Sequence, residues 1–217
     1  MSRRRMNRRP LVALLAAVAG VALIAGCGDD EQEQSSEQPS TAADMDAAFL
    51  AGMTVHHESA IEMARLAQEQ AQHREVRDLA DAIVTTQSTE IQQMNSIYED
   101  LFGKPLAGAQ HGGMGLGEAE MGMSMDPAEL DGAKPFDRVF IDAMIEHHEG
   151  AIRMANIVLA EGEDPKVRDL ASGIIAAQSR EIDQMQAWRE RWYGPGGMMD
   201  GSRDGSGTMD ADDGMGH

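Results

Sequence analysis

The residues best suited to chemistry form one short cluster that occurs twice. The pattern Met-x-x-His-His-Glu runs from Met53 to Glu58 and again from Met144 to Glu149. In a helix, a residue and the third one after it share a face, so each copy places a thioether beside an imidazole. These ligands suit Cu(I) and Ag(I), whereas imidazole with carboxylate accepts Cu(II) or Zn(II). The cluster therefore predicts a metal site, with copper as the leading ion.

Further methionines extend each cluster along the same face. Met63 continues the stripe of Met53 and His56, and Met94 falls at an apolar position of the next helical segment. The carboxylates Glu58 and Glu149 are expected to orient the histidines by accepting an imidazole N–H. The alternative is a purely structural cluster, because buried methionines fill gaps and a core histidine is usually hydrogen-bonded. The presence of two copies favours metal binding.

The clusters belong to an internal duplication that also predicts the fold. Positions 46–94 align without a gap to positions 137–185, and 22 of the 49 pairs are identical. Apolar residues recur at spacings of three and four, which predicts helices over about 42–71, 75–101, 135–161 and 165–194. Each copy is then a helical hairpin, and two hairpins can close one core. We expect an all-α, up-down four-helix bundle.

The first residues predict export and a lipid anchor. Five arginines precede an apolar run from Leu11 to Ala25, and Ile-Ala-Gly leads into Cys27. This is typical of a lipoprotein signal peptide, in which cleavage leaves Cys27 as the lipidated first residue. A net charge of −19 makes nucleic acid an implausible partner and attracts cations. We expect a membrane-anchored protein on the extracytoplasmic side.

The composition divides the chain into a folded body and Gly-rich or polar segments. Methionines also occur outside the periodic helices, at Met114, Met121, Met123, Met125, Met198, Met199, Met209 and Met215. We interpret these as flexible segments that capture soft ions loosely. The predicted parts are a signal peptide 1–26, a disordered tether 27–40, a bundle 41–194 (repeats 44–103 and 135–194, flexible linker 104–134) and a disordered tail 195–217.

The motifs Phe-x-x-x-Met-x-x-His-His-Glu-x-Ala-Ile-x-Met-Ala and Gln-Ser-x-Glu-Ile-x-Gln-Met resemble the bacterial family known as domain of unknown function 305. The resemblance covers residues 44 to 194 and implies a ferritin-like bundle that binds copper or silver through Met and His. It carries this role onto ten residues: Met53, His56, His57, Met63, Met94, Met144, His147, His148, Met154 and Met185.

Enzyme signatures are missing from the sequence. A di-iron bundle site needs Glu-x-x-His, but Met53, Thr54, Met144 and Ile145 stand three residues before the four paired histidines. No phosphate loop or nucleophile motif occurs. We therefore expect a non-enzymatic protein that sequesters Cu(I), or Cu(II) or Ag(I), or hands it to an envelope donor or acceptor protein. The alternatives are a structural or partner-binding bundle without metal and a ferritin-like redox enzyme.

Overall fold

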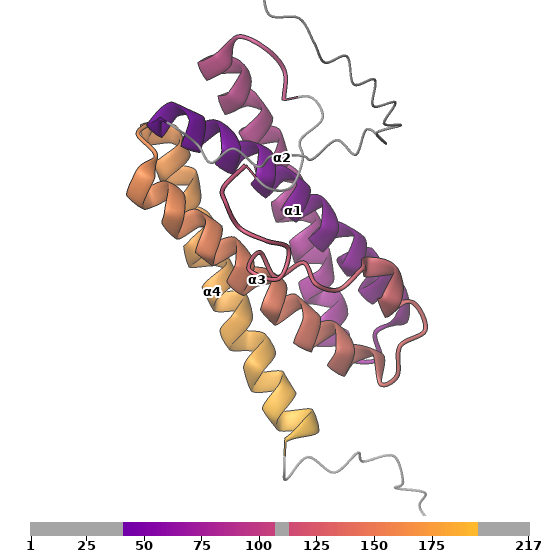
Figure 1. Ribbon diagram of the computed structural model, residues 1–217. Helices are drawn as coiled ribbons and strands as arrows, with labels where there is room; N and C mark the ends of the chain where they lie inside the picture. The colour runs from indigo at the N-terminus through magenta and orange to yellow at the C-terminus, as the bar shows by residue number, and fades with distance from the viewer. Residues whose placement is uncertain (1–40, 107–112, 195–217) are drawn as a thin grey trace, which may run out of the picture. The chain divides into compact units, whose positions relative to one another are not determined.

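Four long helices make up most of the described part of the protein (Figure 1). The computed structural model describes residues 41–106 and 113–194. The helices are α1 (Ala42–Gln70), α2 (Arg74–Phe102), α3 (Phe136–Glu161) and α4 (Pro165–Tyr193), and the short 3-10 helix η1 spans Pro127–Leu130. The described residues contain no strand. The all-α four-helix fold is confirmed, and the predicted helix boundaries are correct to within a few residues.

Several helix ends are fixed by residues that the sequence identifies. The Thr41 side chain accepts a hydrogen bond from the Asp44 amide at 3.1 Å and so caps α1. The Asp164 side chain caps α4 in the same way, and Pro165 takes the first helical position, where its missing N–H costs nothing. Gly103 ends α2 with a φ of 66°, a conformation that glycine adopts without strain.

Two aspartates at equivalent positions tie each hairpin to the other. Asp46 in α1 accepts hydrogen bonds from the amides of Glu163 and Asp164, in the turn between α3 and α4. Asp137 in α3 accepts the amides of Gln72 and His73, in the turn between α1 and α2, each at 2.8 Å. Each helix start thus meets the opposite hairpin's turn, so α1 and α3 run antiparallel.

Helices α1 and α3 lie side by side at the centre of the bundle (Figure 1). The sequence left open whether the two histidine-bearing helices are adjacent or diagonal. They are adjacent, and each packs against its own hairpin partner on its other side. The two His-His pairs therefore lie next to each other.

Part of the linker is packed against the bundle. We call residues 113–134 the covering segment, because it runs across α1 and α3 (Figure 1). Met114, Met121 and Leu130 in this segment are buried in the core. For Met114 and Met121, the interpretation as residues of a flexible segment was therefore wrong.

Other predicted parts lie outside the described residues. These are the signal peptide 1–26, Cys27 with the tether 27–40, and the tail 195–217. Among the described residues, no helix combines the length and the apolar character needed to cross a membrane.

Candidate metal centre

The central feature of the site is a contact between one histidine from each copy. The ring centroids of His56 and His147 are 3.8 Å apart, and the ring planes are inclined by 44°. Their neighbours His57 and His148 are also fully buried. Four buried imidazoles thus lie close together in the interior.

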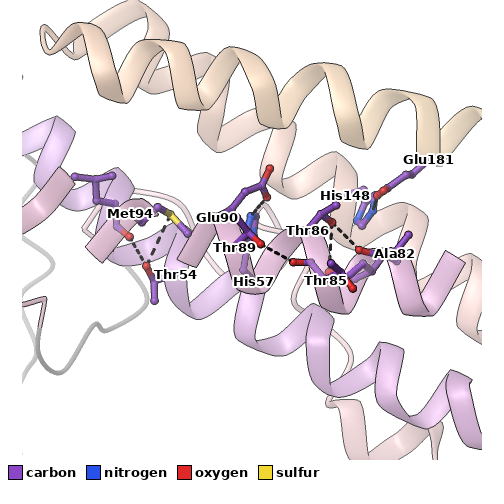
Figure 2. Close-up of polar contacts among 12 residues, drawn as sticks. Thr54, His57, Ala82, Thr85, Thr86, Thr89, Glu90, Met94, His148 and Glu181 are labelled. Atoms are coloured by element: carbon purple, nitrogen blue, oxygen red, sulfur yellow. Dashed lines mark hydrogen bonds and ion pairs between the residues drawn. The ribbon is translucent and has the colours of Figure 1, made fainter. Parts of the chain in front are cut away.

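Glutamates from the second helix of each hairpin hold the outer two histidines. Glu90 in α2 lies 2.7 Å from Nε2 of His57, and Glu181 in α4 lies 2.6 Å from Nε2 of His148 (Figure 2). An ionised carboxylate can only accept, so each Nε2 carries the hydrogen, and in the neutral ring Nδ1 then has the lone pair. The imidazole partners expected from the sequence, Glu58 and Glu149, are exposed. That expectation was wrong.

The inner two histidines differ in their hydrogen bonds. Nε2 of His56 lies 2.9 Å from the backbone carbonyl oxygen of Met121 in the covering segment, to which it donates. Neither ring nitrogen of His147 has a hydrogen-bond partner among the described residues. One imidazole is thus oriented by the backbone, while its counterpart keeps both nitrogens free.

A glycine lets the covering segment approach the histidines. A Cβ atom on Gly150 would lie 1.7 Å from the Met121 carbonyl oxygen, far inside van der Waals contact. The equivalent position in the first copy is Ser59. The two copies therefore differ where the covering segment crosses the second one.

The inner histidines are held neutral. Burial, together with the charge of the neighbouring His57, lowers the pKa of His56 to about 3. Burial and the nearby His56 lower the pKa of His147 well below its usual range. A neutral imidazole keeps a lone pair on one nitrogen, which is the form that binds a metal ion.

The six predicted methionine ligands fall into two groups, each drawn from both copies. The first core cluster contains Met53 and Met94 from the first copy and Met154 from the second. The second core cluster contains Met144 and Met185 from the second copy and Met63 from the first. All six side chains are buried. Each thioether group is thus completed by the opposite copy.

One contact illustrates this crossing, and a second joins two helices of the first copy. A Cβ atom on Gly52 would meet Cε of Met154 at 3.2 Å, so the Met154 side chain reaches across from α3 to α1. The Thr54 hydroxyl lies 3.8 Å from the sulfur of Met94, joining α1 to α2 (Figure 2).

A polar belt separates the two core clusters on all four helices. On α1, His56 and His57 lie between Met53 of the first cluster and Ala60 of the second, and α3 repeats this order in reverse. On α2 and α4, a buried glutamine and a glutamate occupy the same interval. The belt comprises His56, His57, Gln87, Glu90, His147, His148, Gln178 and Glu181.

The chemistry of this centre suits a soft ion. Among the described residues, no group of three or more His, Cys, Asp or Glu is placed to hold a metal ion. Buried imidazoles flanked by thioethers instead provide the nitrogen and sulfur donors that Cu(I) and Ag(I) prefer. All ten predicted ligand side chains are buried, and their role as ligands stays a prediction.

Sequence reasoning missed three parts of the centre: the Met121 carbonyl, the glutamate partners and the buried glutamines Gln87 and Gln178. The repeat contained a usable indication for the last two. Gln and Glu recur at identical spacing in both second helices, three residues apart and therefore on one face. A polar pair repeated on an apolar face points to a buried partner.

The fold and the site define a duplicated helical hairpin bundle with paired histidines in its core. The chain belongs to the DUF305 family, described as a domain of unknown function, whose sequence model matches residues 46–189 and 137–217. The two overlapping matches agree with the internal repeat.

Solved structures of the copper protein CopM are similar to this chain. The chain is 38% identical to CopM in its Cu(I)-bound form, with a TM-score of 0.59 over 69% of this chain and 98% of CopM. The Cu(II)-bound form gives 38% identity and a TM-score of 0.61 over 68% and 97% of the two chains. CopM has also been solved with silver bound.

Two further relatives are more distant. A DUF305 protein from Streptomyces coelicolor, predicted to be secreted, is 29% identical, with a TM-score of 0.60 over 67% of this chain and 93% of its own. Uncharacterized protein L153 of Acanthamoeba polyphaga mimivirus is 35% identical over 51 residues, which cover 24% of this chain. The match spans only 34% of that viral protein.

Proposed function

We propose that this protein binds copper, chiefly as Cu(I) and also as Cu(II) or Ag(I), and sequesters it or hands it on in the cell envelope. The observation that carries the proposal is the buried contact of His56 with His147, between two thioether groups. An ion there meets neutral nitrogen and sulfur donors and no bulk water. The ion is cargo, and no catalytic step is assigned to the protein.

The proposed ligands are the ten residues predicted from the sequence. His56 and His147 lie at the axis that relates the copies, and the outer pair, His57 and His148, present a free Nδ1. Glu90 and Glu181 hold the outer rings through Nε2 and add negative charge close to the ion. Because a metal-bound imidazole usually donates its second N–H, these glutamates fit that supporting role.

A surface cavity supports the proposed loose capture of ions before they reach the core. A cavity of about 380 Å³ lies along the covering segment, and its lining includes Met123, Met125 and three acidic residues. Thioether and carboxylate together can attract and briefly hold a copper ion. We propose that methionines of the linker and the tail deliver ions by this route.

The cellular setting is part of the proposal. Cys27 is the proposed lipidation site, and the tether after it would hold the bundle off the membrane on the extracytoplasmic side. The similarity to a DUF305 protein predicted to be secreted supports export.

A competition titration tests the proposed function. Purified protein is titrated with Cu(I) against a chromophoric chelator, and the titration is repeated with His56, His57, His147 and His148 changed to Ala. We expect the wild-type protein to compete and the quadruple variant to lose that competition. The matched control changes His111 and His217, which lie outside the described residues, to Ala and should bind like wild type. Failure of the wild-type protein to compete would overturn the copper proposal and favour a purely structural bundle.

A separate measurement addresses the redox alternative. A ferritin-like enzyme would consume oxygen when Fe(II) is added, whereas a copper carrier should not. Oxygen consumption faster than in a protein-free Fe(II) solution would argue against the non-enzymatic proposal.

A further inference from the structure

Two buried glutamines in the polar belt have no hydrogen-bond partner. Gln87 in α2 is 2% exposed and Gln178 in α4 is 3% exposed. In both residues, neither the amide nitrogen nor the amide oxygen has a partner. A buried polar group left unpaired costs about 1–3 kcal/mol. The same cost recurs at equivalent positions in both copies. The two amides therefore lower the stability of the ion-free bundle, which indicates a role other than stabilisation.

The position of these amides links them to the metal centre. Gln87 lies one turn before Glu90, which contacts His57, and two turns before Met94. Gln178 stands in the same relation to Glu181 and Met185. Ile83, one turn before Gln87, belongs to the second core cluster, whereas Met94 belongs to the first. Each glutamine therefore lies at the level of the belt and not within either apolar cluster.

One histidine of the belt lacks an acceptor for its imidazole N–H. An imidazole that binds a metal ion through one nitrogen usually donates its other N–H to an acceptor. Three of the four imidazoles already have one: Glu90 for His57, Glu181 for His148, and the Met121 carbonyl for His56. His147 has none. The buried amide oxygens of Gln87 and Gln178 are the unpaired acceptors on the two other helices of the belt.

We propose that Gln87 and Gln178 are positioning residues of the ion-binding centre, whose amide oxygens accept an imidazole N–H when an ion occupies the other nitrogen. His147 is the first imidazole to need this acceptor. This inference rests on the proposed copper binding and adds to it a pair of residues that touch the ligands and not the ion.

The test replaces both amides by an apolar side chain of similar size. The variant Gln87→Leu/Gln178→Leu keeps the volume, adds no new ligand and leaves all ten proposed ligands in place. Its matched control is Gln93→Leu/Gln184→Leu, an equivalent pair on the exposed faces of the same helices. Binding of Ag(I), a diamagnetic probe, is measured by titration, and imidazole ¹⁵N chemical shifts report which ring nitrogen carries hydrogen.

We expect the ion-free buried variant to unfold at a higher temperature, because two unpaired amides are removed. Its Ag(I) affinity should fall about 10- to 100-fold, the range found when supporting partners of metal-bound histidines are lost. The ¹⁵N shifts of His147 in the Ag(I)-bound state should show a mixture of protonation forms. The exposed control should match wild type in both measurements.

The outcomes separate this inference from the function on which it rests. Unchanged Ag(I) affinity and unchanged ¹⁵N shifts in the buried variant, with a wild-type protein that binds, would overturn the glutamine assignment alone. A wild-type protein that binds neither Cu(I) nor Ag(I) would overturn both. Should the double variant fail to fold, the single variants apply the same criteria, and a loss of affinity in either one supports the proposal.

Discussion

The two copies of the hairpin supply matching ligands but treat their central histidines differently. In the first copy, His56 donates to the Met121 carbonyl of the covering segment. In the second copy, the His147 ring occupies the related position and has no hydrogen bond within the described part of the chain. A duplicated chain has two hairpins but only one linker between them, so the linker can complete one half only. The comparison teaches that the ligand set is nearly symmetric while its surroundings are not.

The largest expected effect comes from the lowered pKa that the two central histidines, His56 and His147, share. The His56 pKa falls from 6.5 to about 3 on folding, so the unfolded chain binds more protons between these values. Stability of the ion-free protein should therefore be complete above pH 6.5 and decline as the pH falls toward 3. The loss should reach several kcal/mol, since one pKa unit corresponds to about 1.4 kcal/mol. Urea unfolding at a series of pH values measures it.

The control for this pH effect is the variant His56→Leu/His147→Leu. It should lose less stability on acidification than the wild-type protein does. Parallel pH profiles for the two proteins would mean that other groups cause the acid sensitivity.

The crossed aspartates offer the next largest effect. Asp137 accepts two amides and also contacts Nδ1 of His73, whereas Asp46 accepts two amides and leaves one oxygen unpaired. Changing Asp137 to Ala should cost about 2–4 kcal/mol, because hydrogen bonds to a buried charge are lost. Asp46→Ala should cost less. Chemical denaturation of both variants tests the order, and a larger loss for Asp46→Ala would contradict it.

Making the second copy resemble the first should displace the covering segment. Gly150→Ser introduces the residue found at the equivalent position of the first copy, Ser59, into the space of the Met121 carbonyl. We expect a loss of about 1–3 kcal/mol, as for other overpacked sites. The His56 ¹⁵N shifts should change as well. The control Ser59→Ala should stay within about 0.5 kcal/mol of wild type, and a Gly150→Ser variant equal to this control would refute the close contact.

The smallest expected effect compares the inner histidines directly. His56→Leu leaves the Met121 carbonyl unpaired and should cost about 1 kcal/mol. His147→Leu removes two unpaired nitrogens and should leave the ion-free bundle as stable as wild type or more so. Thermal and urea unfolding of the two single variants measure this difference. Equal stabilities would show that the two histidines are equivalent after all.

The helices and their ends were predictable because local chemistry determines them. Periodic apolar residues predict the four helices, and Thr41 and Pro165, which lie where two of them begin, are residue types that favour helix starts. The adjacency of α1 and α3 was not predictable, since two amphipathic hairpins can close a core in more than one arrangement. That adjacency brings the two His-His pairs into contact and mixes the methionines of the two copies.

The errors concern residues whose role depends on distant parts of the chain. Glu58 follows His57 directly, but helix geometry turns it about 100° away, toward solvent. The histidine partner Glu90 comes from another helix. Met121 resembles the tail methionines because its sequence neighbours are also Gly-rich. Its burial against the bundle depends on the fold and cannot be read from these neighbours. The function of Cys27 and of the tail stays a prediction.

The crossed aspartates also bear on how such a protein arises. In each hairpin turn, two backbone amides donate to an aspartate of the opposite hairpin, so one hairpin alone would leave these amides without that partner. A single hairpin expressed as a separate chain would complete these bonds only by pairing with a second copy. The present protein is in this sense a homodimer joined into one polypeptide. Unlike a symmetric dimer, the single chain has one connecting segment, and this segment covers only one of the two equivalent faces.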